Sequence, residues 1–472
     1  MQREETVDFF VKKAQNDFSV VEENLAKAIN DIRVSQQKKL NYIEEFDAKD
    51  VLSQFAELKK SFSAKDAKYH GKLFGVPVTV KDAICVRGIE SKAGSKILRG
   101  YKPLFDATVI AKARAEGAII LAKTTQDEFG FGTFATNTQN VPKNPFDNER
   151  SCGGSSGGAA GFTAYTKAFH IAIGESTGGS IAAPASFCGC SGITPTYGLV
   201  SRFGLIDYAN SLDKIGSVGR NVHDSALLLE SIAGYDSNDS TSLENGFCAN
   251  EVPLKKIAVI KDFFENCDSE VKKVIQKKID SLRDFFEVKE VSLPINAKYA
   301  LSAYYIIATS EASTNLAKLS GLRYGAQGEV EGKHFDDYFS EVRSKEFGDE
   351  AKRRIILGTF TRMSGFRDAY YLKAMRVRTK LINEFNSAFK DNDLLLCPTM
   401  PITAPKFSEI EKLSPLQNYA MDLCTVPANL AGLPHISCNA GDVKGLPVGL
   451  LAVAPHLKEE RLYSFGKVIE HG

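Results

Sequence analysis

Residues 153–158 read GGSSGG, residues 176–180 read STGGS, and a lone lysine, Lys81, stands upstream in the run VPVTVKD at 76–82. Together these stretches supply hydroxyls and one amine, set among glycines that let the backbone come close to a substrate. A serine hydroxyl is a weak nucleophile until a base removes its proton. The combination therefore indicates a serine hydrolase whose base is a lysine.

Histidine, the usual base, is poorly placed in this sequence. The seven histidines are scattered, and no GxSxG pattern surrounds Ser155, Ser156 or Ser180. His170 lies in an apolar run, which favours a core residue. A Ser–His–Asp triad stays open, because triads assemble from distant positions. The glycine runs also lack the GxxxxGK[ST] pattern of a phosphate loop, which argues against a nucleotide site.

Lys81 follows the apolar run Val76–Val80, which predicts a buried strand. Burial favours the uncharged form of an amine, and an uncharged amine can accept a proton. The alternative is a surface lysine paired with Asp82, and the local sequence alone does not separate the two.

The glycines before Ser180 have a specific chemical use. Acyl transfer develops negative charge on a carbonyl oxygen, and each backbone N–H group aimed at that oxygen contributes roughly 3 kcal/mol to the transition state. Thr177, Gly178 and Gly179 are the candidate donors of this oxyanion hole. A plain glycine-rich turn is the alternative.

Short apolar runs alternate with helical patterns from about residue 71, which indicates an α/β fold. The expected elements are strands at 76–80, 118–121, 170–173, 257–260 and 394–396, helices at 108–116 and 271–286, mostly helical structure over 300–390, and a return to the sheet over 427–451. We predict an N-terminal helical layer over 1–60 and one α/β domain over 61–472, with a helical insertion at about 265–390.

The composition sets limits on function. The chain has 472 residues, with 59 Lys plus Arg against 58 Asp plus Glu, and this balance argues against an extended basic face for nucleic acid. Nine scattered cysteines indicate reduced thiols, and the CGC at 188–190 lacks the CxxC spacing of zinc sites, so no metal is expected. No signal peptide and no run of about 20 apolar residues is visible, so the expected location is the cytoplasm, without membrane contact.

The run from Gly71 to about Gly204 resembles the amidase signature family. The matching pieces are GKLFGVPVTVKD, LAKTTQDEF, NPFD, GGSSGG, STGGSIAAPAS and CGCSGITPTYGLVSRFG. The resemblance implies a mixed β-sheet covered by helices. It implies that Ser180 is the acylated nucleophile, that Ser155 bridges to it after a cis peptide bond, and that Lys81 is the base.

Within that family, the C-terminal half is similar to the glutaminase (A) subunits of Glu-tRNA(Gln)/Asp-tRNA(Asn) amidotransferases. The similar segments are AYYIIATSEASTNLAKLSGLRYG, FGDEAKRRIILGTF and MDLCTVPANLAGLP. This resemblance implies that Tyr304, Arg354 and Asp422 hold glutamine. It also implies a tRNA-binding kinase/transamidase partner that uses ATP and Mg²⁺ and makes most of the tRNA contact, a small third subunit, and no cofactor in this chain.

The sequence departs from the family at one motif. The usual GSDTGGSIR reads GESTGGSIA here, so that Ser176 replaces an Asp and Ala182 an Arg. Losing both members of an ion pair together can be nearly neutral. We expect Glu175 or local packing to fill the gap and activity to survive. Two other functions stay open: a stand-alone amidase acting on small amides, and a scaffold protein that has lost catalysis.

Overall fold

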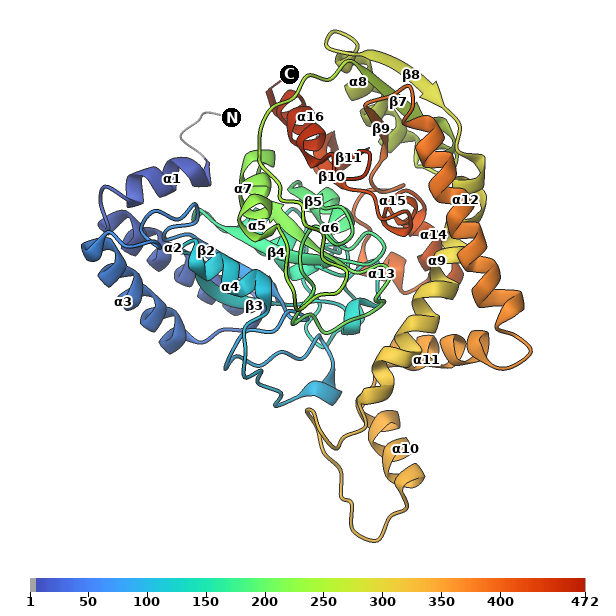
Figure 1. The fold of residues 1–472 in the computed structure, drawn as a ribbon, viewed down its shortest axis with the longest axis horizontal. Coiled ribbons are helices and arrows are strands. Elements are labelled where there is room, and N and C mark those ends of the chain that lie inside the picture. The colour runs from blue at the N-terminus through green and yellow to red at the C-terminus, as the bar shows by residue number, and fades with distance from the viewer. Residues whose placement is uncertain (1–5, 472) are drawn as a thin grey trace.

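The computed structural model describes residues 6–471 and places an eleven-stranded sheet at the centre of the chain (Figure 1). The strand order is β1-β3-β2-β4-β6-β5-β10-β11-β9-β7-β8. The strands are β1 (Ile43–Glu45), β2 (Pro77–Lys81), β3 (Ile119–Thr124), β4 (Ile171–Ser176), β5 (Ser191–Thr194), β6 (Lys214–Gly219), β7 (Lys256–Ile260), β8 (Glu287–Val291), β9 (Leu394–Pro398), β10 (His435–Val443) and β11 (Leu446–Val453). The pairs β2/β3, β2/β4, β7/β8 and β7/β9 are parallel and the other neighbours antiparallel, so the predicted mixed α/β sheet is confirmed.

Helices surround this sheet, and those between residues 294 and 388 extend away from it (Figure 1). They are α1 (Val7–Ala14), α2 (Ser19–Gln37), α3 (Ala48–Ala64), α4 (Thr108–Ala115), α5 (Gly157–Tyr165), α6 (Ala182–Phe187), α7 (Val222–Ile232), α8 (Ser269–Leu282), α9 (Pro294–Asn315), α10 (Phe335–Glu346), α11 (Asp349–Arg362), α12 (Lys373–Ala388), α13 (Phe407–Ile410), α14 (Pro415–Ala420), α15 (Val426–Leu430) and α16 (Glu459–His471). A short 3₁₀ helix, η7 (Met421–Leu423), links α14 to the segment before α15.

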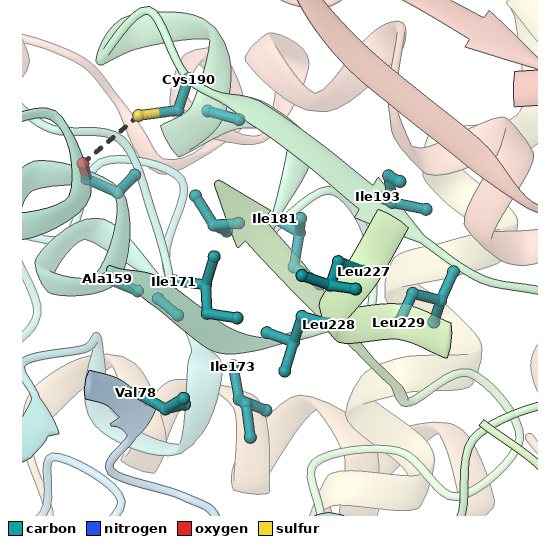
Figure 2. Packing of buried hydrophobic residues seen from close by; sticks show 14 of the residues in the cluster. Val78, Ala159, Ile171, Ile173, Ile181, Cys190, Ile193, Leu227, Leu228 and Leu229 are labelled. Atoms are coloured by element: carbon teal, nitrogen blue, oxygen red, sulfur yellow. Dashed lines mark hydrogen bonds between the residues drawn. The ribbon is translucent and has the colours of Figure 1, made fainter. Parts of the chain in front are cut away.

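The main core packs several helices, among them α7, against the sheet. Figure 2 shows Ile173 of β4, Ile193 of β5 and Leu228 of α7 in one apolar cluster, and all three are buried. Helix α7 begins at a defined place because the Asn221 side chain accepts the backbone N–H of Asp224. This packing fixes the central strands, whose ends carry the polar residues of the candidate site.

The predicted strands and helices occur close to their expected positions, and two segments differ from the prediction. Strand β8 lies inside the segment 265–390, which we expected to be a helical insertion, and extends the sheet at its far edge. Strand β1 likewise interrupts the expected helical layer, because residues 43–45 pair with β3. Whether these segments are separate folding units stays a prediction.

Within residues 6–471, no helix is both long enough and apolar enough to cross a membrane. The same part of the chain contains no group of three or more His, Cys, Asp or Glu side chains arranged to hold a metal ion.

Candidate active site

Lys81 ends strand β2, and its side chain is fully buried. Its Nζ donates to Ser155 Oγ (2.6 Å), to the Glu175 carbonyl oxygen (2.9 Å) and to Glu175 Oε2 (2.8 Å). The alternative of a surface lysine paired with Asp82 was wrong, since the nearest ammonium to that carboxyl is Lys123 Nζ, at 3.8 Å. Lys81 therefore lies where a base for Ser155 is needed.

The parallel pairing of β2 with β4 explains why Glu175 reaches Lys81. Val80 aligns with Ile173, so the carboxyl ends of both strands lie at the same edge of the sheet. Polar residues that follow such strands meet at that edge, where open α/β sheets commonly place their ligand sites.

Ser155 and Ser156 are both fully buried, but they contact different groups. The peptide bond between Gly154 and Ser155 is cis, as the family resemblance implied. Ser156 Oγ donates to the Glu175 carbonyl oxygen (3.1 Å), and its backbone N–H donates to the Ser180 carbonyl oxygen (3.1 Å). Of the two serines, Ser155 is the one whose hydroxyl contacts the lysine amine.

Ser180 lies in the turn that follows β4, and its side chain is 7% exposed. It lines a small cavity together with Gly130, Gly132, Gly154, Gly178, Gly179, Tyr304, Tyr305, Arg354 and Asp422. Among the described residues, its hydroxyl makes no hydrogen bond to Ser155. Catalytic hydrogen bonds are often long before substrate binds, so this geometry is compatible with a relay through both serines.

Gly178 and Gly179 bring the backbone close to the cavity wall. A Cβ at Gly178 would lie 2.6 Å from Tyr304 Oη, and one at Gly179 would lie 2.2 Å from Thr425 Oγ1. Neither backbone N–H donates to an acceptor within residues 6–471. Two unpaired N–H groups beside Ser180 suit an oxyanion hole, because they are available to a substrate carbonyl.

The Thr177 side chain joins two buried carboxyl groups, and its backbone N–H stays a predicted donor of the oxyanion hole. Its Oγ1 lies 2.9 Å from Glu175 Oε1 and 2.8 Å from Asp213 Oδ1. Burial, followed by the nearby Glu175 charge, raises the pKa of Asp213 well above its usual range. Asp213 precedes β6 in a stretch without any recognisable motif, so the sequence offers no signal for it.

Arg354 of α11 supplies a cation to the wall of the same cavity and is 3% exposed. Its Nε donates to Glu350 Oε1 at 2.8 Å, and its Nη1 donates to the Tyr208 hydroxyl. Four aromatic rings surround the guanidinium, with centroids 4.9–5.6 Å away: Phe131, Tyr208, Tyr305 and Tyr419. Within the described chain Nη2 makes no hydrogen bond, so it can receive a substrate carboxylate.

Asp422 lies in η7 and faces the same cavity. Its Oδ2 accepts hydrogen bonds from the Tyr305 hydroxyl (2.6 Å) and from Thr133 Oγ1 (3.2 Å). Burial raises the pKa of this carboxyl to about 6. Sequence analysis selected Tyr304, which lines the cavity beside Gly178, and missed its neighbour Tyr305, which holds Asp422; the YY pair was the available signal.

Local packing occupies the places of the missing Asp and Arg. Ser176 Oγ accepts a hydrogen bond from Asn429 Nδ2 (3.4 Å), and Ala182 is fully buried in an apolar cluster that includes Cys424. Glu175 does not fill this gap, since its carboxylate is directed at Lys81.

The histidine alternative receives no support from the geometry. His170 is buried, as expected, and its Nε2 lies 2.9 Å from Thr79 Oγ1. Burial lowers its pKa to about 3. Within residues 6–471 no histidine forms a hydrogen bond to Ser155 or Ser180, so the base available at this site is Lys81.

Comparison with known proteins agrees with the geometry. The family model described as Amidase matches residues 23–463. The chain is 48% identical over 399 residues to the glutamyl-tRNA(Gln) amidotransferase (A) subunit of Archaeoglobus fulgidus, covering 84% of this chain and 86% of that one. It is 45% identical over 413 residues to the Trichodesmium erythraeum protein of the same name, covering 85% and 84%. The crystal structure of the corresponding Thermotoga maritima protein superposes with a TM-score of 0.77 at 30% identity, covering 98% of this chain and 94% of that one.

Proposed function

The chain belongs to the amidase family, and from this premise we propose that it is the glutaminase subunit of a tRNA-dependent amidotransferase. One observation carries the proposal. A Lys81–Ser155 pair adjoins Gly154, which lines one small cavity with Ser180, and a cation–carboxylate pair, Arg354 and Asp422, lines the same cavity. The first pair suits acyl transfer, and the second suits the charged end of an amino acid. Glutamine and asparagine both present a side-chain amide and such a charged end, and the similarity to glutamyl-tRNA(Gln) amidotransferase (A) subunits favours glutamine.

The proposed chemistry begins at Lys81. The amine accepts the proton of Ser155, Ser155 accepts the proton of Ser180, and Ser180 Oγ attacks the side-chain amide carbon of glutamine. The N–H groups of Gly178 and Gly179 receive the developing oxyanion. The protons return to the leaving nitrogen, ammonia departs, and water hydrolyses the acyl-enzyme.

The charged end of glutamine would bind away from the serines. Arg354 would take the α-carboxylate through Nη2, and Asp422 would take the α-ammonium. Tyr304 and Tyr305 would form the wall between these groups. Glu350 forms an ion pair with Arg354, and this contact holds the guanidinium in position before the substrate binds.

Ammonia from this site would pass to a partner protein that activates the tRNA-linked carboxylate with ATP and Mg²⁺, and a small third subunit would complete the assembly. The near-neutral net charge of +1 is compatible with a chain that leaves most tRNA contact to its partner. A step that serves aminoacyl-tRNA would take place in the cytoplasm.

Glutamine hydrolysis by the assembled complex tests the proposal. We expect ammonia release from glutamine and, on rapid quenching, a glutamyl adduct on Ser180 detected by peptide mass spectrometry. Simple aliphatic amides should react at least about 100-fold more slowly, because they leave Arg354 and Asp422 unpaired. Brisk turnover of such amides by the isolated chain would instead indicate a stand-alone amidase. A folded complex that hydrolyses neither substrate would indicate a scaffold.

A further inference from the structure

Glu175 occupies a position where the family motif GSDTGGSIR carries a serine, and the proposed transfer from Ser180 through Ser155 to Lys81 does not use its carboxylate. The side chain is 4% exposed. Its Oε2 lies 2.8 Å from Lys81 Nζ, and its backbone carbonyl accepts from the same nitrogen at 2.9 Å. One residue thus supplies two of the three acceptors around the amine.

The number of hydrogens on Lys81 explains why two acceptors matter. A neutral amine has two N–H bonds and one lone pair. If both N–H bonds point to Glu175, the lone pair faces the remaining neighbour, Ser155 Oγ, at 2.6 Å. After Ser155 gives up its proton, the third N–H bond of the new ammonium points from Lys81 Nζ to Ser155 Oγ. The arrangement therefore suits the amine both before and after proton transfer.

The network behind Glu175 determines how many negative charges lie near Lys81. Thr177 Oγ1 has one proton but lies within hydrogen-bond distance of two carboxyl oxygens, from Glu175 and Asp213. One of these carboxyls must then donate to the hydroxyl. Asp213 is the donor, because burial and the Glu175 charge raise its pKa well above the usual range. Thr177 can then donate to Glu175.

We propose that Glu175 is a positioning residue for Lys81, holding the amine with its lone pair toward Ser155 and stabilising the positive charge that the amine acquires. Its role corresponds to that of the aspartate that orients the catalytic histidine of a serine protease. The relay is then Ser180–Ser155–Lys81–Glu175, with neutral Asp213 and Thr177 orienting the carboxylate. This inference rests on the proposed function, whose serine and lysine chemistry it deepens.

The step is balanced without any further reactant. The Ser155 O–H bond breaks and a Lys81 N–H bond forms, while the Ser180 proton moves to Ser155. The electron pair of the Ser180 O–H bond forms the bond to the carbonyl carbon, and the carbonyl π pair moves to oxygen. One positive charge appears on Lys81 and one negative charge on the oxyanion. Glu175 faces the first and the glycine N–H groups face the second.

Other charged groups near Glu175 come from two segments. Asp213 precedes β6 and contacts it through Thr177. Its neighbour Lys214 donates to the Leu433 carbonyl oxygen instead. Asp127, after β3, accepts backbone N–H groups from Ala135 and Asn137, and burial raises its pKa to about 6. Since these groups are common to all Glu175 variants, differences between variants report on Glu175.

A fluorophosphonate probe tests the inference on the full chain without glutamine. Ser180 attacks phosphorus and expels fluoride, and the labelling rate is measured by intact mass from pH 5 to 10. In Glu175→Gln and Glu175→Ser, Lys81 loses the negative charge beside it, so it is a weaker base and binds its proton less tightly. We expect the maximal labelling rate to fall about tenfold. The acidic limb of the plot of labelling rate against pH should shift to lower pH by at least about one unit. Glu175→Asp should keep the limb within about half a unit of wild type.

These outcomes separate a charge effect from lost packing. An acidic limb that stays in place or moves up in Glu175→Gln and Glu175→Ser overturns the inference, as does a limb that moves equally in Glu175→Asp. Absence of labelling at Ser180 in the wild-type chain removes the relay and this inference with it. If Ser180 is labelled with the expected profiles but glutamine is not hydrolysed, the proposed function fails while the role of Glu175 stands.

Discussion

The two ends of the candidate active site are built in different ways. At one end, Lys81 and Ser155 are fully buried at the edge of parallel strands and are joined by a 2.6 Å hydrogen bond. At the other end, Arg354 comes from helix α11 and Asp422 from η7, and aromatic rings hold them in place. In the proposed function, the first end, which we call the relay, carries out the bond-making step, and the second end, which we call the clasp, selects the substrate. Changes in the relay should therefore reduce kcat, and changes in the clasp should raise KM.

The strongest test of this division is Lys81→Met. Methionine is about as long as lysine and suits a buried site, but it cannot accept a proton. We expect kcat for ammonia release by the complex to fall at least about 10³-fold, with KM for glutamine within about threefold of wild type.

Lys123→Met provides a matched control, since Lys123 is also fully buried on the neighbouring strand β3 but donates to Asp82, Ile84 and Ser91. This variant should lower the thermal unfolding midpoint and leave the folded protein active. Ammonia release by Lys81→Met within tenfold of wild type would contradict the proposed base.

The clasp is tested next by Arg354→Lys. Lysine has a single nitrogen and cannot bind Glu350 and a substrate carboxylate in the way that the separate Nε and Nη2 atoms can. Truncating a buried charged partner costs about 2–5 kcal/mol in binding, so we expect KM for glutamine to rise on the order of 100-fold while kcat changes much less.

The control is Arg362→Lys, at an exposed position on the same helix, which should leave both constants unchanged. Steady-state kinetics of both variants separate the two parameters. A fall in kcat with an unchanged KM would move Arg354 out of the clasp and weaken the comparison of the two ends.

The two ends also differ in how far the sequence alone predicts them. The relay lies in short motifs, and its strands were visible as apolar runs, so Lys81, Ser155 and Ser180 could be selected by local sequence together with the family resemblance. Even there, the carboxylate of Glu175 beside the amine required the β2/β4 register. The apolar run before Lys81 predicts its burial but gives no sign of the Glu175 carboxylate beside it.

The clasp could be selected only through resemblance. Arg354 and Asp422 have no local pattern that distinguishes them from surface charges, because their environment is made by chain segments far apart in sequence. Tyr208 and Tyr305 reach Arg354 from the segment before β6 and from helix α9. The edge strand β8 was missed for a related reason: its half-exposed, charge-rich sequence EVKEV gives no continuous apolar run.

The smallest expected effects concern the pH dependence of KM for glutamine, which reports on the clasp. Burial raises the pKa of Asp422 to about 6, so the carboxylate proposed to receive the α-ammonium is lost as the pH falls through that value. KM for glutamine should then be about tenfold higher at pH 5 than on its plateau above pH 7. This effect belongs to KM and not to kcat at saturating glutamine, and it is measured by kinetics across pH 5 to 8.

Tyr305→Phe assigns that titration to Asp422. The Tyr305 hydroxyl donates to the ionised carboxylate at 2.6 Å, and losing this donor should raise the pKa of Asp422 by roughly one unit, while the phenyl ring still stacks on Tyr419. The midpoint of the KM profile should move up accordingly, so that KM at pH 7 rises only about twofold. Tyr299→Phe, at an exposed position on the same helix, should leave the profile in place. Asp127 also has a pKa of about 6, but it makes no hydrogen bond to Tyr305 in the described chain, so a midpoint that stays at 6 in Tyr305→Phe would assign the titration elsewhere.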